Sequence, residues 1–518
     1  MSSRKKARRG SVKTEQSRSG LSERTAELLC VGAILILACA LILPNLGNIY
    51  MWQDEAQTAC VARTILTHGV PVGYDGKNHF SQQFGAEYGK NYIWIWHTWL
   101  PFYILAGFFA VFGTSTFVCR LPFALAGIGT VVMIYYYAKM LWRSRRAGVL
   151  AAVILLLNVP FLLLVRQCRY YSMTALFALA GLYAYSEMMR GRRYASVAFV
   201  ISACLLFHTF YVYLPALLAA VIIHAAIYHR DRLRHIVVTS LIAAAVNLPW
   251  MIYFAGVYKV AHPSAGILQR SAIITVNYLV QIVKHVFSPG LLLITALVTT
   301  NAWIRRGRPR VDPENRRHVI LMLLFAACVL VVLAPTSPNS FFRYLAPVIP
   351  ALILIAALIV ESGMKLHPAV GVIALLLLAY WAQMPSYLYE IRHDYNGGVE
   401  GIVRYLTNHA GRDDIVAVNH EDLPIKFYTN LRVISGITGE DYSAAKDADW
   451  VIIRRHLTRG EGGISKYLLG LVKSHKYEVA TLKQYPDVPF ENREDPESHQ
   501  FRTVKGAKPV LIFHRSVK

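Results

Sequence analysis

Runs of apolar residues long enough to cross a lipid bilayer recur along most of this chain, and they constrain its fold more than any other feature. A helix needs about 20 mainly apolar residues to span the hydrocarbon core. The chain has 518 residues, of which 55% are hydrophobic and 16% charged, and its mean hydropathy is +0.38. Such a composition predicts an all-α polytopic membrane protein. The eleven runs that we expect to span are 28–47, 119–142, 148–165, 170–188, 195–207, 210–228, 236–256, 276–304, 317–334, 343–361 and 367–386.

The basic residues predict how these spans are oriented. The formal net charge of +24 comes mostly from short Lys and Arg clusters between apolar runs, and such clusters favour the cytoplasmic side. We therefore expect topology, and not nucleic-acid binding, to explain the charge. The clusters are the basic tail 1–27, "RSRR" at 143–146, "RGRR" at 190–193, "HRDRLRH" at 229–235 and "RRGRPRVDPENRR" at 305–317.

The apolar segment 92–112 decides this topology. If every basic cluster is cytoplasmic, an even number of spans must separate each from the next, and this holds only if 92–112 does not cross. Its sequence "YIWIWHTWLPFYILAGFFAVF" is rich in Trp, which is typical of an interfacial helix. We therefore predict an interfacial helix at 92–112, inside the outer loop 48–118. The N-terminus is then cytoplasmic and the C-terminus lies outside.

The last part of the chain predicts a second domain. After a membrane domain at 28–390, the charge density rises, and 395–518 is long enough to form one core. "GGVEGIVRYLTNHAG" indicates an amphipathic helix ended by Gly411, and "DIVAVN" and "DWVIIRR" indicate strands. We expect a small extracytoplasmic α/β domain. The chain has no N-x-S/T sequon, which is compatible with a bacterial inner membrane, the location that we expect.

Two adjacent carboxylates, Asp54 and Glu55, follow the first span in "NIYMWQDEAQTACVARTILTHG". Carboxylates beside a membrane are costly to desolvate, so they usually face water, a cavity or a partner. A functional interpretation is a general base or a ligand for a cation. The alternative is a hydrated loop, or an acidic helix N-terminus stabilised by the helix dipole. Since adjacent acids repel, we expect a raised pKa for one of the two.

Isolated cations on the predicted outer face form a second candidate group. They are Arg166 and Arg169 in "RQCRYYS", Lys259, and Arg343 in "SFFRYLAP". Single arginines outside oppose the usual charge bias. An Arg beside a Tyr, as at Tyr170 and Tyr344, suits phosphate binding through the planar fork of donors. The alternative for each cation is contact with membrane lipid headgroups. A lone His such as His97 is usually just hydrogen-bonded.

The order of these features resembles the GT-C fold glycosyltransferases of the protein O-mannosyltransferase and aminoarabinose-transferase-like family. The resemblance covers roughly 28–390. It is carried by the single first span, the DE pair and an interfacial segment ending in "FG", and by the later motifs "RLPFALAGIGTVVMIYYYAKML", "RYYSM" and "FRYLAPVIPALILIAAL".

This resemblance implies a function. Members of the family take a sugar from a polyprenyl-phosphate carrier and transfer it, usually with inversion, to an acceptor on the outer face. Acceptors include glycolipids, glycans and protein hydroxyls. The resemblance implies that Asp54 is the base and that Glu55 orients it or contacts the acceptor. The residues that would bind the donor phosphate or substrate are Arg169, Tyr170, Arg343, Tyr344, His97, Arg166 and Lys259.

Two departures from the family pattern matter. Relatives often have "KPPL" or "HPPL" where this chain has "HTWL", so His97 replaces the cation and its charge would depend on pH. Relatives also often have an Asp five residues after the motif Arg, where this chain has Thr174. Because a metal site needs several carboxylates, we predict no required cofactor, with a divalent metal as the less favoured alternative.

Other functions stay open on the sequence. A ligase that moves a whole lipid-linked glycan would need similar residues. A transporter or flippase usually shows internal repeats and broken helices at the bilayer midplane, and we find no repeat of the first half in the second. The seven cysteines have no CxxC spacing and indicate neither a disulfide framework nor a zinc site.

Overall fold

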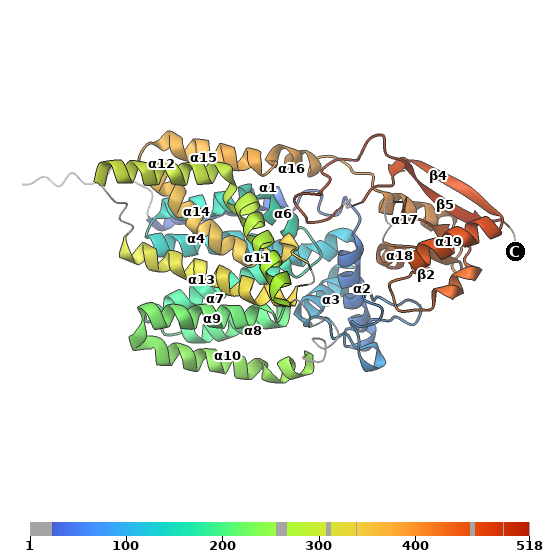
Figure 1. Ribbon diagram of the computed structural model, residues 1–518, viewed down its shortest axis with the longest axis horizontal. Helices are drawn as coiled ribbons and strands as arrows, with labels where there is room; N and C mark the ends of the chain where they lie inside the picture. Colours follow the sequence, from blue (N-terminus) through green and yellow to red (C-terminus); the bar gives the residue numbers. More distant parts are fainter. Residues whose placement is uncertain are drawn as a thin grey trace, which may run out of the picture.

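The protein has a helical part and a smaller part built on a sheet, which lie at opposite ends of an elongated molecule (Figure 1). Helices α2 (Gln53–His68) and α3 (Leu100–Phe112) lie between them. The computed structural model describes residues 23–254, 267–306, 312–337, 339–455, 462–489 and 492–516.

Helices coincide with all eleven predicted apolar runs. In the part of the chain that is described, five helical segments are long and apolar enough to cross a membrane, or seven if each of two bent helix pairs is one span. The helical membrane architecture is confirmed, whereas the number of eleven spans stays a prediction. The helices are α1 (Glu23–Ile42), α4 (Thr116–Trp142), α5 (Arg145–Leu157), α6 (Val159–Val165), α7 (Tyr171–Met189), α8 (Ala195–Thr209), α9 (Tyr213–Tyr228), α10 (Leu233–Phe254), α11 (Ile267–Ile282), α12 (Ser288–Arg306), α13 (Pro313–Thr336), α14 (Val348–Met364), α15 (Pro368–Trp381) and α16 (Met384–Glu390).

Breaks interrupt three of the predicted runs. Helices α5 and α6 meet at 73°, where the side chain of Asn158 accepts a hydrogen bond from the Phe161 amide and so caps the second helix. Helices α15 and α16 meet at 57°. The predicted run 276–304 is two helices, because a π-helical turn follows α11 and Ser288 has a φ of 53°.

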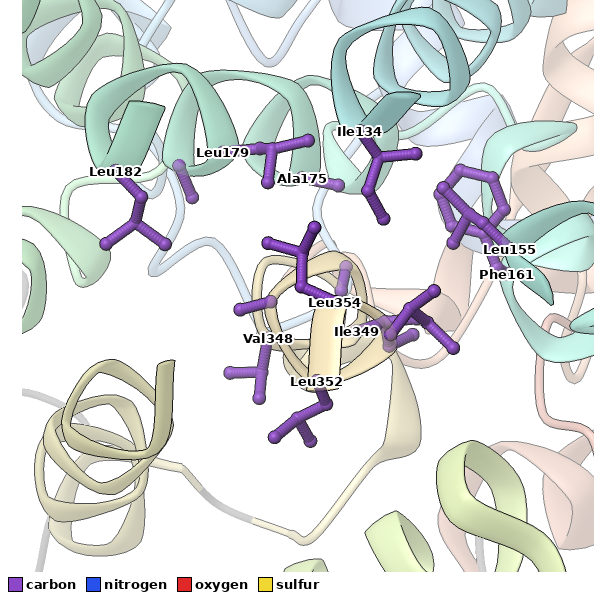
Figure 2. Close-up of a cluster of buried hydrophobic side chains, with 14 of the residues drawn as sticks. Ile134, Leu155, Phe161, Ala175, Leu179, Leu182, Val348, Ile349, Leu352 and Leu354 are labelled. Carbon is purple, nitrogen blue, oxygen red and sulfur yellow. The ribbon is translucent and has the colours of Figure 1, made fainter. Parts of the chain in front are cut away.

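Helix α14 is central to the packing of the bundle. Its buried residues Leu354 and Ile349 point toward side chains from four other helices, whereas Leu352 points to the opposite side of α14 (Figure 2). The labelled partners are Ile134 of α4, Leu155 of α5, Phe161 of α6, and Ala175, Leu179 and Leu182 of α7. Helix α14 directly follows Arg343 and Tyr344, so this close packing fixes their position.

The predicted interfacial helix is shorter than expected. Only Leu100–Phe112 is helical, because the residues before it pair with the outer loop: Ile93 bridges to Val72 and Trp94 to Tyr88. Pro101 stands in the first turn of α3, where its missing N–H costs nothing. A helix of 13 residues is about 20 Å long, which is too short to span the membrane.

The C-terminal part contains a five-stranded sheet with strand order β2-β1-β3-β5-β4. Strands β1, β2 and β3 are parallel, and β5 is antiparallel to both β3 and β4. The two predicted strands are β1 and β3, and the predicted helix is α17, which ends at His409, before Gly411. The elements are α17 (Gly398–His409), β1 (Ile415–Val418), α18 (Asp422–Thr429), β2 (Arg432–Ile434), β3 (Trp450–Ile452), α19 (Gly462–Ser474), β4 (Tyr477–Pro486) and β5 (Pro509–Arg515).

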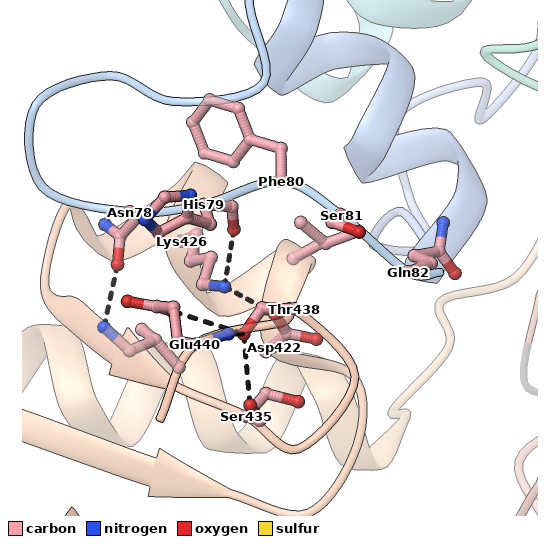
Figure 3. Close-up of polar contacts among 12 residues, drawn as sticks. Asn78, His79, Phe80, Ser81, Gln82, Asp422, Lys426, Ser435, Thr438 and Glu440 are labelled. Carbon is pink, nitrogen blue, oxygen red and sulfur yellow. Dashed lines mark hydrogen bonds and ion pairs between the residues drawn. The ribbon is translucent and has the colours of Figure 1, made fainter. Parts of the chain in front are cut away.

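Helix α18 docks this sheet domain onto the start of α2. Asp422 and Lys426 form a fully buried ion pair of 2.6 Å. Gln53 donates to Asp422 at 2.7 Å, and Lys426 donates to the carbonyl of His79 at 2.8 Å. Figure 3 shows this junction, with the outer-loop residues 78–82 lying against α18. Because Gln53 directly precedes Asp54, the sheet domain helps to hold the first turn of α2.

Candidate active site

A cavity of about 640 Å³ lies where α2, the outer loop, the bundle and the sheet domain meet. Its lining includes Asp54 with several glutamines, among them Gln82. It also includes the cations Arg169, Arg343 and Arg493, and apolar and aromatic side chains of residues 210–212 and Leu333. An acidic group, a set of cations and an apolar surface therefore face one space.

Asp54 is the carboxylate that lies among the cations. Its Oδ2 is 3.2 Å from Nη1 of Arg343 and 3.6 Å from Nη2 of Arg169. Gln82 donates to Oδ1 at 3.2 Å. Burial raises the pKa of Asp54, but the guanidinium groups of Arg343, Arg169 and Arg493 lower it more, so the net pKa lies below its ordinary value. Asp54 is therefore deprotonated at neutral pH.

Glu55 faces away from this cavity, because successive helix residues point about 100° apart. Its two oxygens accept hydrogen bonds of 2.8 Å from Nε and Nη2 of Arg120. They also accept from the amide of Cys168 at 2.7 Å and from Nδ2 of Asn492 at 2.9 Å. The side chain is fully buried. Glu55 therefore holds four segments together and is not among the residues that line the cavity, and its contact with the acceptor stays a prediction.

The pKa of Asp54 does not show the effect expected of adjacent acids. Asp54 and Glu55 were expected to raise the pKa of one of them by repulsion. Instead each carboxylate has its own arginines, and the pKa of Asp54 is lowered by Arg343, Arg169 and Arg493 in spite of its burial. The neutralising partners are distant in sequence, so the adjacency of the two acids could not reveal them.

Arg169 and Tyr170 line the cavity at the corner between α6 and α7. Nη1 of Arg169 donates to the carbonyl of Asp54 at 3.1 Å and to Oγ1 of Thr58 at 2.9 Å. The ring of Tyr170 stacks on Phe210 with centroids 4.6 Å apart. These contacts fix the orientation of the guanidinium relative to α2, so Arg169 is preorganised to meet an anion.

Arg343 and Tyr344 line the same cavity from the short turn Phe342–Leu345 that precedes α14. Besides its contact with Asp54, Nη1 of Arg343 donates to Oε1 of Glu494 at 2.9 Å. Its guanidinium carbon lies 4.3 Å from the centre of the Phe341 ring. The structure thus brings together Asp54 and both Arg–Tyr pairs of the sequence analysis.

His97 also lines the cavity but does not supply a cation. Its Nδ1 accepts a hydrogen bond from the indole N–H of Trp94 at 3.2 Å, which leaves the proton on Nε2. Burial lowers the pKa of His97 well below 6.5, and the charge of Arg169 lowers it further. His97 is therefore neutral at physiological pH, and the possibility of a positive charge at "HTWL" is not supported.

Arg166 lies away from the cavity. Nη1 of Arg166 donates to the carbonyls of Ile42 at 2.6 Å and Pro44 at 2.9 Å, which satisfies the C-terminal end of α1. It does not line the cavity, and its assignment to substrate binding stays a prediction. Lys259 lies outside the described residues.

Comparisons with known proteins extend these observations. Residues 96–253 match the family described as dolichyl-phosphate-mannose-protein mannosyltransferase. The structure is similar to that of ArnT from Cupriavidus metallidurans bound to undecaprenyl phosphate, with 14% identity, 95% of this chain and 98% of that chain covered, and a TM-score of 0.57. It is also similar to the oligosaccharyltransferase of Archaeoglobus fulgidus, with 13% identity, 89% and 70% covered, and a TM-score of 0.51. No curated protein matches the sequence.

The protein has the GT-C fold. The resemblance seen in the sequence is therefore confirmed, and the chain is an integral membrane protein of the architecture that ArnT has. The segment that matches the family begins just before His97 and includes Arg169 and Tyr170. Asp54 and Arg343 lie outside that segment, and the fold brings them to it.

The cavity of this GT-C protein is also lined by residues that the sequence analysis missed. Arg493 and His420 line the cavity from the sheet domain, and Gln82 lines it from the outer loop. Arg493 stands in "ENREDPESHQ", where charged residues are typical of a solvated loop and predict no site. Only the return of this connection to the membrane domain brings Arg493 to the cavity.

The described residues contain no group of three or more His, Cys, Asp or Glu side chains that could hold a metal ion. Of the acidic residues at the cavity, Asp54 is engaged by arginines, and Glu87 accepts hydrogen bonds from Gln57 and from the amides of Gln82 and Gln83. The independence from a metal stays a prediction.

Proposed function

We propose that this protein is a glycosyltransferase that moves a sugar from a polyprenyl-phosphate-linked donor to an acceptor hydroxyl outside the membrane, with inversion at the anomeric carbon. The acceptor is a glycolipid, a glycan or a protein. The observation that carries the proposal is the ionised Asp54 carboxylate between Arg343 and Arg169 on the wall of a large cavity.

Each charged group has a part in this reaction. The acceptor oxygen attacks the anomeric carbon while the bond from that carbon to the phosphate oxygen breaks. Asp54 takes the proton of the acceptor hydroxyl as general base. Arg169 and Arg343 bind the phosphate, which leaves with the bonding electron pair and gains negative charge. The polyprenyl phosphate is then released, and the sugar stays on the acceptor.

The arginines also adjust the base strength of Asp54. In the free protein they lower its pKa, which makes it a weak base. A bound phosphate occupies the guanidinium groups and adds negative charge nearby, and both effects raise the pKa of Asp54. The carboxylate therefore becomes a stronger base when the donor is bound. Asp54 then takes the proton of the acceptor hydroxyl at the stage when sugar transfer can follow.

The apolar wall supports a lipid carrier. Phe210, Tyr211, Val212 and Leu333 line the cavity beside the cations, so an isoprenoid chain and its phosphate have neighbouring complementary surfaces. The fold match to ArnT, a protein whose structure holds undecaprenyl phosphate, supports the same class of donor.

Reconstitution tests this function. Purified protein in proteoliposomes is given polyprenyl-phosphate sugars and candidate acceptors, and consumption of the donor is followed. Asp54→Asn keeps the size and removes the base, so we expect a loss of at least about a hundredfold, the lower range for removal of a general base. Asp413→Asn, at an exposed position of the sheet domain, is the matched control and should keep full activity. Full activity in Asp54→Asn would refute the assignment.

A further inference from the structure

The connection between β4 and β5 leaves the sheet domain and returns to the membrane domain. Its described residues, 487–489 and 492–508, make contacts with four separate segments of the chain. These contacts are Asn492 with Glu55 at 2.9 Å, Glu494 with Arg343 at 2.9 Å, Glu497 with Lys284 at 2.8 Å, and His499 with Glu390 at 2.6 Å.

Arg493 lies between two anchored residues of this connection. Asn492 and Glu494 are 6% and 4% exposed, and their contacts fix the backbone on both sides of Arg493. The side chain of Arg493 lines the cavity, and its guanidinium carbon lies 5.3 Å from the centre of the Trp52 ring. A cation from the sheet domain is thus directed into the cavity that holds Asp54.

Three arginines share the lining of this cavity. Nη1 of Arg343 contacts Asp54 and Glu494, and Arg169 donates to Thr58 and to the carbonyl of Asp54. Arg493 adds a third guanidinium, and each guanidinium offers charge-assisted donors to a phosphate.

We propose that Arg493 binds the donor phosphate together with Arg343, so that the extracytoplasmic domain supplies part of the active site. The inference rests on the proposed function, since it assigns a third binding residue to the same phosphate. Its consequence is that donor binding requires the sheet domain to be docked, with residues 492–494 against the membrane domain.

Binding of undecaprenyl phosphate without a sugar tests Arg493 apart from catalysis. Arg493→Gln removes the charge, and we expect the affinity for this lipid to fall about tenfold, the usual effect of losing one charge-assisted hydrogen bond. Arg502→Gln is the matched control, because Arg502 is an exposed arginine of the same connection that stacks on Tyr389 and does not line the cavity. Its affinity should stay within about twofold.

A labelling experiment on the unaltered protein gives a second measurement that does not depend on how a variant folds. An arginine-specific dicarbonyl reagent is applied with and without undecaprenyl phosphate, and the modified residues are identified by mass spectrometry. We expect the lipid to protect Arg493 and to leave Arg502 equally reactive.

The outcomes separate the two proposals. If the unaltered protein does not bind undecaprenyl phosphate, the proposed function fails and this inference fails with it. If it binds, but Arg493→Gln binds equally well or Arg493 reacts equally with and without the lipid, only the role of Arg493 is overturned.

Discussion

The Glu55 carboxylate and the Arg120 guanidinium form a buried ion pair with two hydrogen bonds of 2.8 Å each. Removal of one partner from such a pair leaves a buried charge without compensation, which costs about 3–5 kcal/mol. We therefore expect Glu55→Gln to lower the thermal unfolding temperature markedly, whereas Asp54→Asn, one residue away, should lower activity and keep the unfolding temperature close to that of the unaltered protein. Thermal unfolding in detergent measures both. A stable but inactive Glu55→Gln protein would mean that Glu55 takes part in the chemistry.

Arg343 should set the pH at which activity is lost in acid. Asp54 must be ionised to act as base, and burial alone raises its pKa, while Arg343 lowers it most among the arginines. In the unaltered protein the acid limb of kcat/KM due to Asp54 should lie below pH 3.8, its ordinary pKa. In Arg343→Gln the pKa of Asp54 rises, and the acid limb should move to higher pH along with a lower overall rate. Rate profiles between about pH 4 and 8 test this, with Arg502→Gln as control. An unmoved limb would contradict the electrostatic coupling.

Only the features that depend on the local pattern of apolar residues could be predicted from the sequence. A membrane-length apolar run folds as a helix wherever it stands, so the helices of the bundle were predictable, as were the short strands β1 and β3. The roles of single charges were not. Arg166 and Arg169 stand three residues apart in one motif, yet Arg166 contacts the end of α1 and Arg169 contacts Asp54. The tertiary partner decides the role of each.

The same holds for the carboxylates and for Arg493. Asp54 and Glu55 are adjacent, but Glu55 meets Arg120, Cys168 and Asn492, which no spacing in the sequence connects. Arg493 comes from the far end of the chain. These contacts depend on how the sheet domain docks onto the membrane domain. Residues at such an interface have no regular spacing in the sequence, so no sequence pattern predicts their contacts.

Chelation should leave the activity unchanged. Metal-dependent chemistry needs several ligands around the ion, and the described part of the chain brings together no such group of His, Cys, Asp and Glu. We expect full donor consumption after treatment with EDTA, measured in the reconstituted assay. Loss of activity that Mg²⁺, Mn²⁺ or Zn²⁺ restores would contradict the prediction and would point to ligands that substrate phosphate completes.

The outer location of the loop between α3 and α4 can be tested by labelling. Thr114 is exposed in this loop, while Arg192 is exposed in the basic cluster expected inside. A membrane-impermeant thiol reagent should label Thr114→Cys in intact cells and label Arg192→Cys only after the membrane is opened. The unaltered protein, with its native cysteines, controls for background. The reverse pattern would mean that α3 is part of a true span and that the assigned orientation is inverted.

The ion pair of His499 with Glu390 should make the docking of the β4–β5 connection depend on pH. Burial lowers the pKa of His499, but the Glu390 carboxylate, at 2.6 Å, raises it more, and the net pKa lies above 6.5 in spite of an opposing effect of Arg166. A group whose pKa is raised on folding stabilises the fold fully below its unfolded pKa, and this stabilisation is lost as the pH rises through the folded pKa. His499→Gln should therefore lower stability by about 1.5–3 kcal/mol near pH 6 and by much less near pH 9. Thermal unfolding at both values measures this, with Glu390→Gln expected to give the same pattern. An effect of equal size at both pH values would show that His499 contributes packing and not charge.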